Sequence, residues 1–331
     1  MTAKGRGIIL HPSFARARDG LGRALEEPIR GQLIFVVGLS GSGKSEIRYE
    51  CMRSFAGPPR GWSLGYLPAI SVRASPTDRS TFNPKEFMGR LYLALHDPDI
   101  SWSADRSSVD TPDESHARED SLLKSELWLA ASAKWTEHKL RCFVEHTAIA
   151  RHVRAIFVEE GASLTYTQRQ KKPSDHMVNY MCLAEEVNVT LVFFGVPRMA
   201  ALWESNAEIL RRSRFVFVDR YRLDDANERK TFERMAISIA ARYRFCRSDL
   251  ARRTLDWAYV CSAGTFGELD SFYRRADDFR ANEGRDRITK DDLEKAISSE
   301  TNLRTLHQDA AMFDLLKAPA RPSVIQRALG T

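Results

Sequence analysis

The segment Gly38–Ser45, which reads GLSGSGKS, constrains the fold of this 331-residue chain more than any other stretch. It matches the pattern G-x-x-x-x-G-K-[S/T], in which backbone amides curl around phosphate oxygens. The apolar run LIFVV comes directly before it, as is typical of a buried parallel strand, and a helix is expected from about Ser45. A strand, a phosphate loop and a helix in this order predict a parallel α/β nucleotide-binding domain.

The loop supplies a complete set of phosphate ligands. Lys44 places a positive charge toward the β- and γ-phosphates, and the hydroxyl of Ser45 is a ligand for Mg²⁺. The following helix adds the positive end of its dipole. The sequence therefore predicts ATP and Mg²⁺ as cofactors, bound by Gly38, Ser40, Gly41, Ser42, Gly43, Lys44 and Ser45.

Two acids follow a second apolar run, RAIFVEEGA. The first acid after such a strand helps to hold Mg²⁺ and is usually Asp. Here it is Glu159, one methylene longer, which we expect to move the metal contact to a bridging water and to slow hydrolysis. The second acid, Glu160, is placed to orient or deprotonate an attacking water. Water as the acceptor favours an ATPase over a small-molecule kinase.

Three arginines lie between a predicted helix and the last predicted strand, in EILRRSRFVF. Arg211, Arg212 and Arg214 can reach the γ-phosphate held by a neighbouring subunit and stabilise charge in the transition state. The alternative is a basic helix end that complements the helix dipole.

Apolar runs predict five strands, in LIFVVG and in residues 66–74, 154–162, 189–195 and 214–219, with helices between them. A long helical region is expected from about Ser121 to Ala150, with Trp128 and Trp135 in packing roles. Helices dominate after Asp224. We expect an N-terminal helix or arm over 1–30, an α/β domain over 31–224 with an acidic loop insertion at 97–120, a helical lid over 225–300 and an extended tail over 301–331.

Composition and charge limit the classes of protein to which this chain can belong. The net charge is +6, which permits binding to a polyanion such as DNA. No segment approaches the roughly 18–20 consecutive apolar residues of a membrane span, and the N-terminal apolar run is too short for a secretory signal. We therefore expect a cytoplasmic protein with no membrane contact. Five scattered cysteines indicate neither a disulfide framework nor a zinc site.

With these parts in order, residues from about 10 to 300 resemble the AAA+ ATPases, which implies a P-loop α/β domain with a five-stranded parallel sheet and a small α-helical lid. The lid likeness is carried by CSAGTFGELDSFYRRA and ITKDDLEKAI. Arg214 matches the arginine finger in an S-R-x context. Within that superfamily the chain resembles the TnsC/TniB transposition regulators, through HPSF at 11–14, the phosphate loop, the acid pair with Gly161-Ala162, and LVFFG at 191–195.

The resemblance implies an ATP-dependent homo-oligomer, a hexameric or heptameric ring or a filament, around double-stranded DNA. Such a regulator links a TniQ-like target-selection protein to the transposase. DNA-binding candidates are Arg73, Arg79 and Lys85, and also the basic loop 165–172, although either loop can be simply solvated. The chain departs from the family pattern at Glu159, at Val196, where a polar sensor is expected, and at Gly267, where many lids place a sensor arginine.

Other classes remain open. A P-loop kinase would be a monomer that transfers phosphate to a metabolite and ignores DNA. A nucleotide-dependent scaffold with little hydrolysis fits Glu159 and the missing sensor residues. An initiator-like or secretion-linked AAA+ protein would keep the chemistry and change the partner. The segment beyond the lid is a candidate for docking a partner protein, or else a helix with a frayed end.

Overall fold

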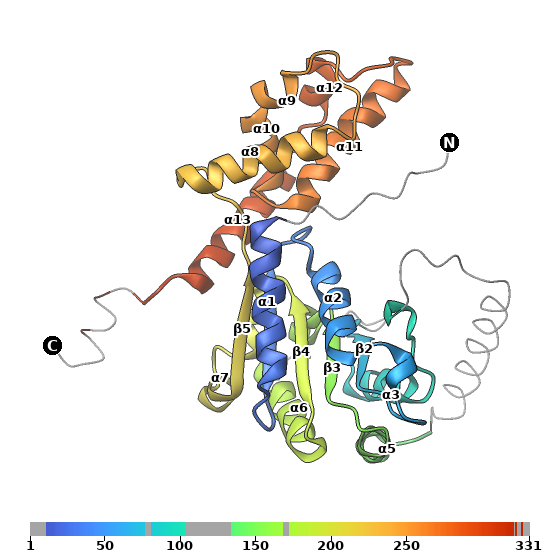
Figure 1. The fold of residues 1–331 in the computed structure, drawn as a ribbon. Coiled ribbons are helices and arrows are strands. Elements are labelled where there is room, and N and C mark those ends of the chain that lie inside the picture. The colour runs from blue at the N-terminus through green and yellow to red at the C-terminus, as the bar shows by residue number, and fades with distance from the viewer. Residues whose placement is uncertain are drawn as a thin grey trace. The chain divides into compact units, whose positions relative to one another are not determined.

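The computed structural model describes residues 11–76, 81–103, 134–167 and 172–320, together with 322 and 326. By its contacts the chain divides into two units. The α/β unit comprises Pro12–Val37 and Gly43–Val218. The helical unit contains, among the described residues, His11, Gly38–Ser42 and the chain from Asp219 onward. Figure 1 shows the strands and helices of each unit.

The α/β unit is built on a five-stranded parallel sheet in the order β2-β3-β4-β1-β5. The pairing aligns Leu33 with Leu191 between β1 and β4, and Arg73 with Glu159 between β2 and β3. This sheet, followed by helices, confirms the predicted fold class. The strands are β1 (Leu33–Gly38), β2 (Ala69–Arg73), β3 (Ala155–Glu159), β4 (Thr190–Gly195) and β5 (Ser213–Val218).

Helices cover the sheet because both of its faces are apolar. Alternate strand residues such as Ile34, Phe157 and Phe194 pack with α1 and α2 in one buried cluster. Short polar residues start the helices: the Asn83 side chain accepts the amides of Lys85 and Glu86 at the start of α3. The helices of this unit are α1 (Pro12–Glu26), α2 (Lys44–Ala56), α3 (Pro84–His96), α5 (Glu137–Ala150), α6 (Pro173–Val187) and α7 (Ala207–Arg212).

The other sheet face centres on Phe35, which is fully buried. Its ring lies 5.4 Å from that of Phe193, 4.6 Å from that of Trp203 and 5.7 Å from that of Phe215. Aromatic pairs at these separations add to the stabilisation from area burial alone. This cluster holds β1 against β4 and β5 and so fixes the strand that leads into the phosphate loop.

The helical unit has its own core, formed around Phe232, Phe272 and Tyr273. The Thr289 side chain caps one of its helices by accepting the Asp292 amide. Its helices are α8 (Ala226–Ala240), α9 (Leu250–Arg253), α10 (Leu255–Ser262), α11 (Phe266–Asn282), α12 (Lys290–Lys295) and α13 (Glu300–Lys317).

The segment expected to be an extended tail is instead helix α13 as far as Lys317. Phe313 is 1% exposed, and Asp314 forms a 2.5 Å ion pair with Arg220. The sequence pattern underestimated this helix because its apolar residues are sparse, while its anchoring ion pair joins residues 94 positions apart.

Several expectations fall outside the described residues. They are Arg79, Trp128, residues 104–120 of the acidic insertion, the first part of the helix expected over 121–150, and residues 168–171 of the basic loop. In the part that is described, no helix has the length and apolar character needed to cross a membrane. All five cysteines are free.

Phe35→Ala should destabilise the protein by about 3–5 kcal/mol, because it removes a buried ring and leaves a cavity among three aromatic neighbours. Chemical denaturation followed by circular dichroism measures this loss. The control is Leu64→Ala, since Leu64 is fully exposed and should change stability by no more than about 0.5 kcal/mol. Equal effects of the two substitutions would contradict the placement of Phe35.

Candidate nucleotide site

The loop after β1 has a backbone that requires glycine. Gly41 and Gly43 adopt φ values of 68° and 89°, in the left-handed region that other residues enter only at a cost. Helix α2 begins at the next residue, Lys44. Left-handed turns that lead into a helix start expose successive amides on one side, which is the geometry of an anion-binding nest.

Lys44 is half-buried at the start of α2, and Ser45 is exposed beside it. Burial lowers the pKa of the Lys44 ammonium to about 8, while the charge of Glu160 acts in the opposite direction. An ammonium with a depressed pKa gains more than an exposed one from an anion that binds beside it. The charge of Lys44 therefore favours a bound phosphate.

The loop also fits a nucleotide through an unsatisfied polar group. The hydroxyl of Ser42 is buried and has no hydrogen-bond partner among the described residues. Such groups are rare in folded proteins, and beside this turn a phosphate oxygen would supply the missing partner. The loop geometry, the half-buried Lys44 and the Ser42 hydroxyl together fit the phosphates of ATP.

Within the helical unit, Gly267 contacts the loop directly. Its amide donates a 2.7 Å hydrogen bond to the carbonyl of Gly41. A Cβ atom on Gly267 would lie 2.6 Å from the Cα of Gly41, so this approach excludes any side chain. The family resemblance predicts a sensor arginine at this position. The start of α11 instead offers a backbone amide and no cationic side chain.

The acid pair lies at the end of β3. Glu159 is the last strand residue, and Glu160 has a φ of 54° and a ψ of 39°. A left-handed conformation in a residue other than glycine costs free energy and concentrates at functional sites. Because the sheet is parallel, the loops after β1 and β3 leave the same edge, so Glu160 shares this edge with Lys44, whose pKa its charge affects.

A buried arginine holds the first acid. Arg48 lies one helical turn beyond Lys44, is 3% exposed, and places Nη2 2.9 Å from Oε1 of Glu159. Its Nη1 donates a 2.6 Å hydrogen bond to the hydroxyl of Ser71 on β2, which donates to the same Oε1 at 3.3 Å. No motif in the sequence indicates Arg48 or Ser71, although the four-residue spacing from Lys44 places Arg48 on the same helix face.

The predicted metal ligands differ in how well they fit Mg²⁺. The hydroxyl of Ser45 stands exposed at the start of α2. Glu159 instead contacts a guanidinium and a hydroxyl, so its carboxylate fits the role of an arginine partner better than that of a direct metal ligand.

The second acid, Glu160, is also paired with an arginine. Arg73, a predicted DNA contact, places Nη2 3.7 Å from Oε1 of Glu160, and both side chains are more than half exposed. Lys85, the other described DNA candidate, lies in the first turn of α3 and is half-buried. Arg73 is therefore at the carboxyl edge of the sheet, beside the acid proposed to act on water.

The three candidate finger arginines have different surroundings. Arg212 is bound within its own chain by a 2.7 Å ion pair to Glu185. Arg211 is exposed and Arg214 is half-buried, and neither has a carboxylate partner among the residues described. All three lie at the amino end of β5, whereas the phosphate loop follows the carboxyl end of β1.

The loops after β3 and β4 are packed together. A Cβ atom on Gly161 or on Gly195 would lie 2.8 or 2.7 Å from the sulfur of Met199, so a side chain at either position would force Met199 to move. Val196, in place of a polar sensor, accepts the amide of Met199 through its backbone. Arg198, which the sequence analysis did not single out, is exposed in this loop and lies 4.9 Å from the Tyr166 ring.

The HPSF segment contributes to both units. In the helical unit, Nδ1 of His11 lies 3.0 Å from the hydroxyl of Tyr221, and its ring stacks on Phe266. In the α/β unit, the buried ring of Phe14 lies beside Gly43, where a Cβ atom would approach it to 3.4 Å.

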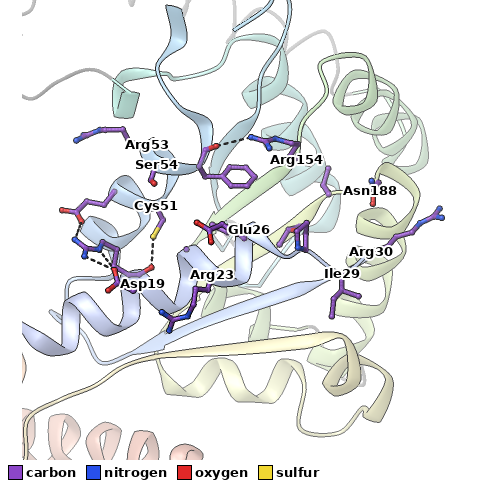
Figure 2. Close-up of a pocket in the computed structure, with 18 residues that line it drawn as sticks. Asp19, Arg23, Glu26, Ile29, Arg30, Cys51, Arg53, Ser54, Arg154 and Asn188 are labelled. Carbon is purple, nitrogen blue, oxygen red and sulfur yellow. Dashed lines mark hydrogen bonds and ion pairs between the residues drawn. The ribbon is translucent and has the colours of Figure 1, made fainter. Parts of the chain in front are cut away.

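A groove of about 1280 Å³ lies at the amino ends of β3 and β4, away from the phosphate loop (Figure 2). Arg30, Arg53 and Arg154 line it, and each donates to a backbone carbonyl. Asp19 and Glu26 also line it, so the groove carries both signs of charge. Its position at the opposite edge separates it from the nucleotide chemistry.

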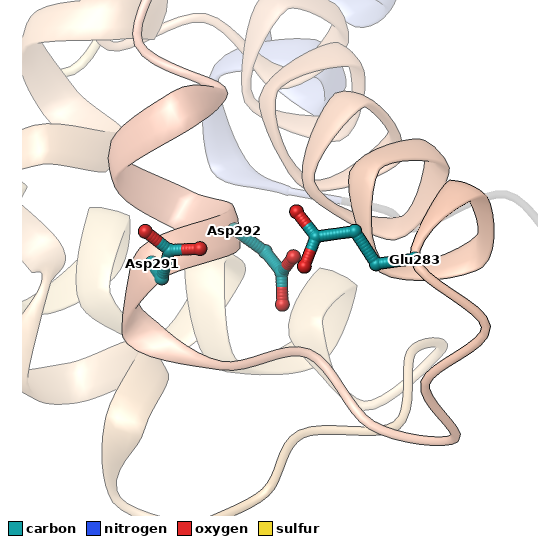
Figure 3. Close-up of side chains that lie close together, drawn as sticks. All are labelled: Glu283, Asp291 and Asp292. Carbon is teal, nitrogen blue, oxygen red and sulfur yellow. The ribbon is translucent and has the colours of Figure 1, made fainter.

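Three acids in the helical unit lie close together, namely Glu283, Asp291 and Asp292 (Figure 3). Arg285 and Lys295 form ion pairs with them, including two from Lys295 at 2.7 and 2.8 Å. Asp292 also caps α12 with Thr289. This cluster is therefore a helix start whose acids are paired with neighbouring cations.

No protein-family model matches the chain, and no curated protein matches it significantly. Among solved structures, the Walker-type ATPase of Pyrococcus abyssi is similar at 12% identity and a TM-score of 0.49, over 91% of this chain and 73% of that one. The Aeropyrum pernix ORC2 protein, in its ADPNP-ADP complexes, is similar at 13% and 0.48, over 90% and 72%. Drosophila ORC bound to DNA is similar at 12% and 0.48, over 99% and 85%. The likeness is remote, and the assignment of the fold rests on this chain's own strand order and phosphate loop.

Nucleotide affinity should fall as pH rises through about 8, by up to about tenfold per pH unit, because Lys44 then loses its proton in the free protein and must regain it on binding. Below that pH Lys44 is already charged and affinity should be flat. Calorimetry near pH 9 in buffers of different ionisation enthalpy should detect proton uptake. Lys44→Arg keeps its charge and should bind without uptake; uptake that persists in that variant would contradict the assignment.

Proposed function

We propose that this protein is an ATPase that oligomerises on double-stranded DNA and regulates DNA transposition by linking a target-selection protein to the transposase. The observation that carries the catalytic part is the placement of the phosphate loop and the acid pair at one edge of the sheet. The family resemblance in the sequence supports the transposition part.

Each described residue has a defined task in this proposal. ATP supplies a phosphoanhydride whose cleavage is assisted by the charge of Mg²⁺. Lys44 binds phosphate oxygens, the loop amides orient them, and Ser45 offers a hydroxyl to the metal. Glu160 holds the attacking water and accepts its proton. The exposed, left-handed position of Glu160 supports this role, since its carboxylate is open to solvent.

The finger arginines support an oligomer. Arg211 and Arg214 lie at the amino end of β5, one strand length from the phosphate loop. A strand of six residues spans about 20 Å at roughly 3.3 Å per residue, beyond the reach of an arginine side chain. In the proposed oligomer these arginines serve the nucleotide of a neighbouring subunit, so that a monomer has half of a catalytic site.

Arg73 connects DNA to this site. It is the described DNA candidate nearest the catalytic acids, and it contacts Glu160. A phosphate that binds Arg73 competes with this exposed ion pair, which is weak because solvent screens it. DNA binding would thereby release Glu160 to act on water.

A nucleotide-dependent scaffold with little hydrolysis is the second candidate. The contact of Glu159 with Arg48 and the backbone contact at Gly267 favour it, since both remove features that speed hydrolysis. A monomeric kinase is distinguished from the main proposal by the experiments below, whereas an initiator-like protein would share their outcomes and differ in its partner.

Electron microscopy and sedimentation with ATP, with and without duplex DNA, test the assembly. We expect DNA-dependent rings or filaments, and loss of both with Lys44→Ala, which removes the phosphate contact. A monomer that ignores both ligands would contradict the proposal, and phosphate transfer to a metabolite would establish the kinase.

Glu160→Gln should bind ATP with unchanged affinity, hydrolyse about 10²–10³-fold more slowly and give longer-lived DNA complexes. Glu294→Gln, at an exposed acid of the helical unit, is the control and should behave as wild type.

Mixing variants tests the shared site. Arg214→Ala and Glu160→Gln should each be nearly inactive alone, because one lacks the finger and the other lacks the acid that acts on water. A mixture should regain part of the activity at interfaces that pair an intact Glu160 with an intact Arg214. The same mixing with Arg211→Ala identifies which arginine acts. No recovery for either arginine would show that the finger lies elsewhere.

A further inference from the structure

The two acids at the end of β3 each have their own arginine. Glu159 contacts Arg48 at 2.9 Å, and Glu160 contacts Arg73 at 3.7 Å. Two carboxylates side by side repel each other unless cations compensate them. In this chain two guanidinium groups provide that compensation before any metal binds.

The two pairs differ in their surroundings. The side chains of Arg73 and Glu160 are 66% and 54% exposed, so solvent screens their pair. Arg48 is 3% exposed, and its Nε is buried without a hydrogen-bond partner among the described residues. An arginine is always protonated in proteins, so this buried charge needs a permanent partner. Glu159 is the carboxylate within ion-pair distance of it.

Several contacts fix the Arg48 guanidinium in place. Its Cζ lies 4.2 Å from the centre of the Tyr49 ring, and its Nη1 reaches Ser71 and the sulfur of Met52. The hydroxyl of Ser71 accepts from Arg48 and donates to Glu159. Residues from α2, β2 and β3 thus close a triangle of polar contacts, in which Oε1 of Glu159 contacts both Arg48 and Ser71.

The length of the Glu159 side chain matches this arrangement. An Asp at position 159 would end one methylene short of the present carboxylate and would lose reach toward Arg48. The additional methylene of Glu159 is therefore explained by an internal partner. A cation entering beside Oε1 would also meet the fixed charge of Arg48, which disfavours direct coordination.

We propose that Arg48 is a positioning residue that holds Glu159 as an internal ion pair, so that Glu159 does not coordinate Mg²⁺ and nucleotide binding depends little on the divalent ion. The metal part rests on the proposed ATP binding, whereas the ion pair itself rests on the 2.9 Å contact between Arg48 and Glu159. Glu160 then remains as the acid free to act on water.

The first test uses the full-length protein without nucleotide or metal. Thermal unfolding is measured for Arg48→Met, Glu159→Gln and the double variant, with Arg73→Gln and Glu160→Gln as the matched exposed pair. Either single change at 48 or 159 should lower the melting temperature, and the double variant should recover part of the loss because no buried charge is stranded. The exposed pair should show additive, small effects. The proposal is overturned if the melting-temperature changes at 48 and 159 deviate from additivity no more than those of the exposed pair.

The second test measures the affinity for a fluorescent ATP analogue with Mg²⁺ and with EDTA. Wild type should change by less than about tenfold between the two conditions. Arg48→Met frees the carboxylate for the metal and should raise the gain from Mg²⁺ at least about tenfold over wild type, while Arg48→Met/Glu159→Gln should lose that increase. Arg48→Lys, which keeps a cation, should remain close to wild type.

The outcomes separate the two proposals. A large Mg²⁺ dependence in wild type that Glu159→Gln removes would make Glu159 a metal ligand and overturn the inference. An unchanged Mg²⁺ gain in a folded Arg48→Met protein would show a merely structural arginine and would also overturn it. If wild type binds no nucleotide in either condition, the proposed function fails, and the unfolding cycle still decides whether the ion pair exists.

Discussion

The burial of β1 is the constraint on which the rest of the α/β unit depends. All six of its residues are buried, with β4 paired along one side and β5 on the other. A strand in this position cannot shift by one residue without turning its side chains to the wrong face. The register therefore determines where the chain leaves the sheet, and the phosphate loop starts at that point. Because β3 runs in the same direction, its two acids leave at the same edge.

Charge compensation is the second organising property of this edge. The helix that follows the phosphate loop brings Lys44 and, one turn later, Arg48 to the same side. One cation is positioned for a ligand and the other for the protein's own carboxylate. The two acids consequently have different environments, one tied to a buried guanidinium and one exposed beside Arg73. Separate environments for adjacent carboxylates are a common way in which proteins assign them different roles.

The sequence predicted the strands and the glycine-rich turn between β1 and α2 well, because both depend on local patterns. Continuous apolar runs such as LIFVVG and TLVFFG became β1 and β4, and the glycines of GLSGSGKS mark a backbone that only glycine adopts easily. The partner of Arg48 could not be predicted in the same way. An arginine in a helix usually faces solvent, and its contact with Glu159 joins residues that only the folded sheet brings together. The pairing of Arg212 with Glu185 was hidden for the same reason. The left-handed backbone of Glu160 also leaves no trace in composition or periodicity.

The sulfur of Met199 has a mechanical consequence for the carboxyl edge of the sheet. It fills the space left by two glycines, one directly after Glu160 and one at the end of β4. Because the atoms between the two loops are close-packed, a displacement of one loop is transmitted to the other. A change in the packing of Met199 would therefore displace the backbone beside Gly161, next to Glu160, by steric contact. This steric coupling is separate from the ion pairs that Arg48 and Arg73 form with the two acids.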